Sequence, residues 1–412
     1  MKPLRLLVLP LAFLALACKD PAGPPARITA LPRALTAEEQ RLIEADNRFA
    51  IKLLKQATAD TRDTLENLFV SPLSIAMALG MTYNGAAGTT EDAMRAALEL
   101  EGMSVAEVNE SYRSLIKLLR ELDPRVRFQI ANSIWYLQGY SIEQAFLDAN
   151  RTYYDATVEA HDFASPTAPT TINNWVSQQT RGVIDKIVDY IPDDMRLYLI
   201  NAIYFRGDWT EQFDRGRTQP RPFRLLDGTT VNVPTMTHGK PVDLRATYRT
   251  NALVLDLPYG GQAFSMTIVV PSDTVNVDRL VAELTLDQWN NWIASLGPSE
   301  AEVFLPKFKL TNDLLLIPSL EAHGMGVAFD PQVADFTRIH SPSELFITEV
   351  KHKTYVNVDQ EGTEAAAVTS VGVGVTSVPP SFQVDRPFLF ALRENLSGTI
   401  LFMGVIRDPR GG

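Results

Sequence analysis

Hydrophobic positions recur with helical spacing early in the chain and alternate with period two in much of the rest. Behind the capping box Thr36-x-x-Glu39, one apolar stripe has helical spacing (Leu42, Phe49, Leu53, Leu54). Similar patterns predict helices over 89–100, 105–122, 141–150, 172–180, 280–295 and 314–323. Alternation predicts strands over 126–137 and 346–359, and a buried apolar run predicts one over 197–205. Further strands are expected over 303–310, 388–392 and 399–406, and several more with turn signals lie between 223 and 270. The class is therefore α+β, with helices mostly early and strands mostly late.

One predicted helix lies in the segment from Asn67 to Gly80, which is apolar almost all round. Ser71 can cap this helix, and Pro72 suits its first turn. A helix without a polar face is expected at the centre of a fold. Its small side chains would let another element approach closely (Ser74, Ala76, Ala78, Gly80).

A second unusual stretch is the run from Gly362 to Ser377. No charged residue lies between Glu364 and Asp385, although 21% of the chain is charged. With period two, one set of positions is small and then β-branched (Thr363, Ala365, Ala367, Thr369, Val371, Val373, Val375), as a strand in a packed sheet requires. The other set begins with Glu364 and includes two glycines, which suits a more open face. The stretch can form a loop or a strand, and a small-residue linker or an ordinary buried strand remain alternatives.

Length and charge limit the function classes. With 412 residues and 45% hydrophobic residues, the chain can bury a large core as one large domain or two ordinary ones. The net charge is −11, with acidic and basic residues mixed along the sequence. This composition argues against a nucleic-acid partner.

The first residues have the pattern of an export signal. Residues 1–18 combine a basic start, an apolar body too short for a confident membrane span, and a cleavage region ending at Cys18. Cys18 occupies a lipobox-like position, so we expect export to the periplasm or the outside, with lipid on Cys18 as the only membrane attachment. Plain secretion is the alternative, because Ala15-x-Ala17 also fits a general signal peptidase. Residues 19–35 are proline-rich and predict a tether, which leaves 36–412 as the folded domain.

Catalytic motifs are weak. Ser114-x-x-Lys117 matches a β-lactamase-type pattern, but Lys-Thr-Gly and Gly-x-Ser-x-Gly are absent from the sequence. The five histidines show no metal spacing. We therefore expect no enzyme, no metal and no cofactor.

Six separated motifs, in this order, resemble those of the serpin family. They are Asn67-Leu-Phe-Val-Ser-Pro-Leu-Ser-Ile, Asn201-Ala-Ile-Tyr-Phe-Arg-Gly-Asp-Trp209, Val303-Phe-Leu-Pro-Lys-Phe, Gly362-Thr-Glu-Ala-Ala-Ala, Arg386-Pro-Phe-Leu-Phe and Leu401-Phe-Met-Gly. The resemblance covers about residues 36–410 and, with the N-terminus, suggests a bacterial secreted or lipoprotein-type member. It implies a large central mixed sheet, further sheets, about eight or nine helices and an exposed reactive loop.

The resemblance also implies a mechanism and its residues. Counting from Gly362 and from Pro387-Phe388 places the reactive bond between Thr376 and Ser377. The insertable hinge would be Gly362, Thr363, Glu364, Ala365, Ala366 and Ala367. Ser71, Ser74, Asn201 and His352 would lie under the sheet where strands part, and Trp209 near the place where the hinge enters. For His352 and Trp209, ordinary core packing is the alternative. Gln360 stands where the family usually has an acid, which puts one ion pair at that place in doubt.

Target preference follows by exclusion. No Lys or Arg lies between Glu364 and Arg386, so the loop lacks the basic residue after which trypsin-like proteases cleave. The aromatic Phe382 lies beyond the prolines, so a chymotrypsin-like protease also lacks a suitable residue. We expect a monomer that forms a covalent acyl complex with an elastase-like or subtilisin-like serine protease, cleaved after Thr376 or after Val375. A non-inhibitory serpin that acts as a carrier, chaperone or structural protein is the alternative.

Overall fold

The computed structural model describes residues 27–61, 66–342, 344–363 and 380–411. These residues form nine α-helices: α1 (Ala37–Asp60), α2 (Pro72–Tyr83), α3 (Gly88–Ala97), α4 (Val105–Glu121), α5 (Gln144–Tyr154), α6 (Ala168–Gln179), α7 (Val277–Glu283), α8 (Leu286–Ala294) and α9 (Ile317–Leu320). Six of the nine precede residue 180, as the hydrophobic pattern predicts.

The strands form two sheets. The six-stranded sheet has the order β11 (Phe308–Leu315), β12 (Lys351–Val358), β13 (Gly362–Thr363), β4 (Leu197–Asp208), β2 (Val126–Leu137) and β3 (Thr157–His161). The ten-stranded sheet has the order β1 (Leu68–Val70), β16 (Ile400–Ile406), β15 (Phe388–Glu394), β9 (Phe264–Pro271), β8 (Ala252–Tyr259), β7 (Val242–Tyr248), β10 (Gly297–Pro306), β6 (Thr230–Thr237) and β5 (Gln219–Arg224), with β14 (Ser381–Gln383) also paired to β10. Since β2 and β3 run parallel and the other pairs of the six-stranded sheet antiparallel, the expected large mixed sheet is confirmed.

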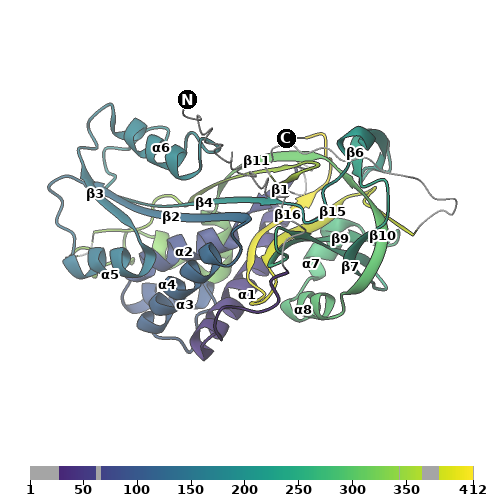
Figure 1. Cartoon of the computed structure of the whole chain (residues 1–412). Coiled ribbons are helices and arrows are strands. Elements are labelled where there is room, and N and C mark those ends of the chain that lie inside the picture. Colours follow the sequence, from purple (N-terminus) through teal and green to yellow (C-terminus); the bar gives the residue numbers. More distant parts are fainter. Residues whose placement is uncertain (1–26, 62–65, 343, 364–379, 412) are drawn as a thin grey trace, which may run out of the picture.

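Helices cover both faces of the six-stranded sheet. Figure 1 shows α6 over one face, and α2 with α3, α4 and α5 under the other. The predicted stripe of α1 is fully buried (Leu42, Phe49, Leu53 and Leu54 are all 0% exposed), and Thr36 and Glu39 form the predicted capping box. Helix α2 is buried along nearly its whole length between β4 and β16, as expected for a helix without a polar face.

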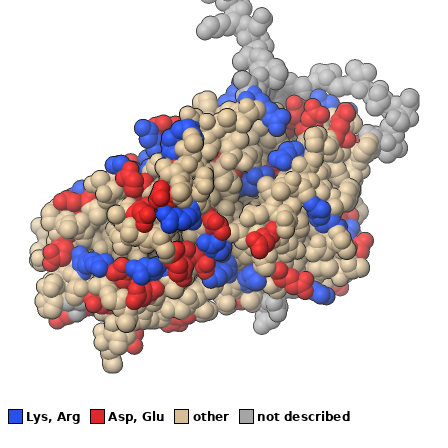
Figure 2. Space-filling view, turned by 90° about the horizontal axis from the view of Figure 1, so that it is seen from below, with Lys and Arg blue, Asp and Glu red and all other residues tan. Residues whose placement is uncertain are grey.

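The surface of the helical side carries both charges. Figure 2 views this side and shows basic and acidic side chains intermingled rather than segregated. Several of them form ion pairs between elements, for example Arg41 with Glu107 and Arg120 with Asp155. In the described ranges, no helix is long and apolar enough to cross a membrane.

Three predicted elements are wrong in extent. The strand expected over 346–359 begins only at Lys351, because the backbone before it bonds outside the sheet: Ile347 donates to Ala328 and Val350 accepts from Leu316. The helix expected over 280–295 is two helices, because Thr285 caps α8 by accepting from the Gln288 amide. The strand expected over 303–310 divides between the two sheets at Lys307.

A fourth difference concerns the helix expected over 314–323. Leu314 and Leu315 belong to strand β11, and α9 is a single turn followed by a wide turn over 321–325. Gly324 has φ of 91° and interrupts the helical backbone, so the predicted stop at this glycine is confirmed. The predicted helix begins at Ile317, three residues later than predicted.

Part of the predicted tether packs against the domain. The amide of Ile28 donates to the carbonyl of Gly261 at 2.8 Å, and Ile28, Leu31 and Leu35 contact the main core. Arg33 also pairs with Glu39 of α1. Residues 27–35 therefore belong to the packed domain. The predicted tether is left with residues 19–26, which lie outside the described residues.

Candidate functional site

The first two residues of the predicted hinge already lie inside the six-stranded sheet. Gly362 and Thr363 form β13, which pairs antiparallel with β12 on one side (Val358 opposite Thr363) and with β4 on the other. On the β4 side, Gly362 stands opposite Asp208 and Thr363 opposite Gly207. A Cβ on Gly362 would lie 2.1 Å from the Gly207 carbonyl oxygen, so only glycine fits between the two strands here.

Buried aromatic side chains hold this short strand. The hydroxyls of Thr363 and Tyr259 are 2.7 Å apart and share a hydrogen bond, and both side chains are buried. The ring of Trp209 stacks on Tyr259 with centroids 4.4 Å apart. Trp209 also binds the backbone before the hinge, since its indole nitrogen donates to the Asp359 carbonyl and its amide to the Glu361 carbonyl. Trp209 is thus packed in the core and in contact with the segment that leads into β13.

The acid missing at Gln360 is present one residue later. The side chain of Gln360 donates to the hydroxyl of Thr218 at 2.6 Å. Its neighbour Glu361 is 2% exposed and forms an ion pair with Arg215. The acidic side chain next to Arg215 in this segment is therefore Glu361, and position 360 contributes a hydrogen bond instead.

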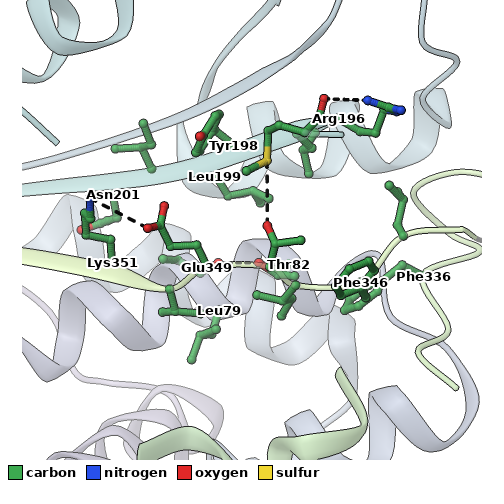
Figure 3. A pocket seen from close by; sticks show the side chains of 18 of the residues that line it. Leu79, Thr82, Arg196, Tyr198, Leu199, Asn201, Phe336, Phe346, Glu349 and Lys351 are labelled. Carbon is green, nitrogen blue, oxygen red and sulfur yellow. Dashed lines mark hydrogen bonds and ion pairs between the residues drawn. The ribbon is translucent and has the colours of Figure 1, made fainter. Parts of the chain in front are cut away.

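Beyond β13 the two flanking strands separate. In the described part of the sheet, β12 pairs with β11 and β13, and β4 pairs with β13 and β2, so no ladder joins β12 to β4 directly. A cavity of about 340 Å³ lies in this opening. Figure 3 shows it between β4, represented by Tyr198 and Leu199, and the segment of Phe346 and Glu349, with Leu79 and Thr82 of α2 beneath.

His352 and Ser71 lie at the edge of this opening, where β12 begins above the N-terminus of α2. The backbone amide of Ser71 donates to Nε2 of His352 at 2.9 Å, and the Ser71 hydroxyl donates to the Leu401 carbonyl at 2.8 Å. Burial lowers the pKa of His352 to about 3. Because its Nε2 is an acceptor, this histidine is neutral and joins β12 to α2.

A second polar chain joins α2 to the other side of the opening. The Ser74 hydroxyl donates to the Asn201 side-chain oxygen on β4. The Asn201 amide donates to Asn132 on β2 at 2.6 Å, and Asn132 donates to the Tyr154 carbonyl of α5 at 2.6 Å. The sequence-predicted residues Ser71, Ser74, Asn201 and His352 are thus gathered under the place where β12 and β4 part.

The remaining predicted site residues lie outside the described residues. They are the rest of the hinge (Glu364, Ala365, Ala366, Ala367), the proposed reactive bond (Thr376, Ser377), the alternative cleavage position Val375, and Cys18. Their roles remain predictions.

Sequence reasoning missed four contributors to the site: Tyr259, Asn132, Glu361 and Arg215. Asn132 could have been found, because it interrupts an otherwise apolar face of β2 (Val126, Phe128, Ile130, Ile134). Glu361 could have been found as the acid next to Gln360. Nothing local marks Tyr259 or Arg215, whose partners lie more than 100 residues away in the chain.

The arrangement is suited to receiving a strand. Among the described residues, β12 and β4 have edges that no ladder joins beyond β13, a cavity lies between them, and polar groups under the sheet bond to each side. In the described parts of the chain, no group of three or more His, Cys, Asp or Glu side chains could hold a metal ion.

Comparisons with known proteins agree with this geometry. A family model described as "Serpin (serine protease inhibitor)" matches residues 44–409. The chain is 33% identical over 387 residues to iripin-8 of Ixodes ricinus, covering 90% of this chain and 94% of that protein. It is 32% identical over 382 residues to the leukocyte elastase inhibitor of Equus caballus, covering 90% and 100%. The crystal structure of the thermophilic serpin tengpin in its native state matches with a TM-score of 0.82 and 29% identity, covering 93% and 97%. The chain therefore has the serpin fold, belongs to the serpin (serine protease inhibitor) family, and is not an enzyme.

Proposed function

We propose that the protein traps serine proteases as a suicide substrate, with Thr376–Ser377 as the reactive bond and residues 362–375 as the strand that inserts after cleavage. The observation that supports this most directly is β13, whose two residues are already seated between β12 and β4 above an open gap. The inserting segment would continue a ladder that has begun.

The register of β13 supports the assignment of inward and outward positions. Opposite residues of an antiparallel pair point to the same face of a sheet. Continuing the pairs Gly362–Asp208 and Thr363–Gly207 by one step places residue 364 opposite Arg206. The next step places residue 365 opposite Phe205, which is 7% exposed and faces the core. The charged Glu364 would thus meet an arginine on the outer face, and the small Ala365 would enter the core.

The chemical steps are those of an interrupted acyl transfer. The protease serine oxygen attacks the carbonyl carbon of Thr376, the bond to the Ser377 nitrogen breaks, and the new amine leaves with a proton. The first product is an ester that joins the protease to Thr376. Insertion of about 14 residues at roughly 3.3 Å each then carries the protease on the order of 45 Å. Distortion of its oxyanion hole prevents water from releasing the ester.

We propose an elastase-like or subtilisin-like target. The small and β-branched residues Val373, Val375 and Thr376 support this preference, and one similar protein is named leukocyte elastase inhibitor. Cleavage after Val375 remains the alternative position.

The test is to mix the purified protein with elastase, subtilisin, trypsin and chymotrypsin and to examine the products on a denaturing gel. The expected result is a band at the summed mass with elastase or subtilisin, and sequencing of the released peptide should begin at Ser377. A matched variant, Thr376→Arg, should shift complex formation towards trypsin. Only cleaved, unlinked product with every protease would contradict the proposal and favour a non-inhibitory carrier, chaperone or structural role.

We further propose that the protein is exported as a monomer, as a bacterial secreted or lipoprotein-type serpin with lipid on Cys18. The support is the pattern of residues 1–18 alone, and the similar proteins named above come from animals and from a thermophilic source. Expression in a bacterium with a tagged fatty acid should label the wild type and not Cys18→Ala. Equal labelling of both, or none of either, would exclude the lipid.

A further inference from the structure

Two arginines stand directly opposite each other on the outer face of the six-stranded sheet. In the antiparallel pair of β2 and β4, Arg127 is the partner of Arg206. Opposite residues in such a pair have Cβ atoms about 5 Å apart, and like charges at that distance destabilise the sheet. Neither guanidinium forms an ion pair with any residue that the structure describes.

A third arginine lies beside this pair. Arg125 precedes Arg127 by two residues, and the three side chains line one hollow of about 560 Å³. Among the residues that the structure describes, Asp208 is the one acidic side chain that lines the hollow, and it is exposed. Outside the hollow, Asp359 is close enough for Arg206 to lower its pKa, although burial raises the pKa of Asp359 overall. The described residues that line the hollow carry three positive charges against one negative charge.

The walls of the hollow are fixed by hydrogen bonds that leave the guanidinium groups free. The carboxylate of Asp123, buried behind the hollow, accepts from the amide of Arg125 at 3.0 Å and from the amide of Gly261 at 2.8 Å. Thr210 donates to the Gly260 carbonyl at 3.0 Å, and Trp209 is held by the contacts described above. These bonds set the positions of the strand ends and the turn around the hollow, so the arginines are arranged before any ligand arrives.

We propose that this hollow binds a small oxyanion with two or more negative charges, of the phosphate or pyrophosphate class. Guanidinium groups bind such oxygens with paired hydrogen bonds, and three of them around one hollow match a multivalent anion better than a single carboxylate. A bound dianion would also offset the repulsion between Arg127 and Arg206. The site residues lie outside the reactive loop, but the proposed insertion would bring Glu364 opposite Arg206, so the uncut chain is the form that tests the site.

The experiment is calorimetric titration of the uncut full chain with pyrophosphate at about 150 mM salt, where non-specific attraction is largely screened. The expected result is one site per chain, with affinity reduced about tenfold or more in both Arg127→Gln and Arg206→Gln. Arg279→Gln is the matched control, because it removes an equal charge from an exposed position on α7 and should leave binding unchanged.

A second measurement separates loss of binding from loss of folding. Without pyrophosphate, Arg127→Gln should melt at the same or a higher temperature than the wild type, because it removes a like-charge neighbour. With pyrophosphate, the wild type and Arg279→Gln should gain stability, and Arg127→Gln should not. The absence of binding to the wild type, or equal affinity in the wild type and both hollow variants, would overturn the proposal.

Discussion

A charge placed on the inward face of the inserting strand should convert the inhibitor into a substrate. The perturbation is Ala365→Arg, at the position that the β13 register places opposite Phe205. The Phe205 ring packs against three others, with centroid distances of 5.3 Å to Tyr259, 6.0 Å to Phe264 and 6.4 Å to Phe402. A guanidinium brought against this cluster would have no counter-charge.

The magnitude follows from the cost of burying an unpaired charge, about 4 kcal/mol after relaxation. If about half of that cost is felt in the transition state for insertion, the barrier rises by about 2 kcal/mol and insertion slows roughly 30-fold. The protease then has time to hydrolyse the acyl-enzyme before it is distorted. The expected outcome is normal cleavage of the loop with almost no covalent complex.

Glu364→Gln is the control, because the same register places residue 364 opposite Arg206, which is only half-buried and lies on the other face of the sheet. A polar substitution at such a position typically changes stability by less than about 0.5 kcal/mol, so the complex yield should change by no more than about twofold. Both variants are incubated with elastase, and the ratio of complex to cleaved product is read from a denaturing gel. Equal yields from the two variants, or a larger loss in Glu364→Gln, would refute the register and the small-hinge argument together.

Three further predictions concern the groups beneath the sheet. The pKa of His352 is about 3 in the folded protein, against an ordinary value of 6.5, so the folded state binds fewer protons and stability is lost as pH falls through this window. Between about pH 8 and pH 5, denaturation midpoints should show the wild type losing about 2 kcal/mol more than His352→Gln. Asp46 acts in the opposite sense: burial raises its pKa to about 7 despite the hydrogen bond from Tyr112, so its contribution falls as pH rises from about 4 to 7, and Asp46→Asn should be relatively more stable at pH 8 than at pH 4. Asn201→Ala removes the link from Ser74 to Asn132 and should lower the free energy of unfolding by about 1–3 kcal/mol, whereas Asn201→Asp should cost more unless it is protonated; unchanged midpoints would contradict the network.

The sequence predicted the parts of the site whose chemistry is local. Ser71 has the cap position before Pro72, and Gly362 with its small neighbours has the composition of a hinge. Ser71 caps α2 and Gly362 begins β13, because each motif combines a backbone requirement with a burial requirement that local sequence expresses. The lengths of α8 and β12 were harder to predict, since they depend on a cap at Thr285 and on hydrogen bonds to Ala328 and Leu316 rather than on periodicity.

Partners across the fold could not be predicted from pattern alone. The cross-strand pair of Arg127 and Arg206 requires the register of β2 against β4, and a shift by one residue would put the two arginines on opposite faces of the sheet. The bond from Tyr259 to Thr363 likewise depends on how the ten-stranded sheet meets the six-stranded sheet at Trp209. Such contacts are decided by tertiary packing, for which a single sequence contains no local signal.

The size of the gap between β12 and β4 predicts how much more stable the cleaved form with its inserted strand is than the uncut form. New ladder bonds contribute about 1 kcal/mol each, and ordering the inserted backbone costs about as much per residue, so the two nearly cancel. The surplus comes from filling the cavity of about 340 Å³. At about 24 cal/mol per Å³, complete filling contributes about 8 kcal/mol. A chain of this length unfolds with an entropy of about 0.8 kcal/mol/K, so cleavage within the loop should raise the melting temperature by about 10 °C. Differential scanning calorimetry before and after limited elastase digestion, with heat-inactivated elastase as the control, measures this change, and an unaltered melting temperature would mean that the uncut form stores no energy for the trap.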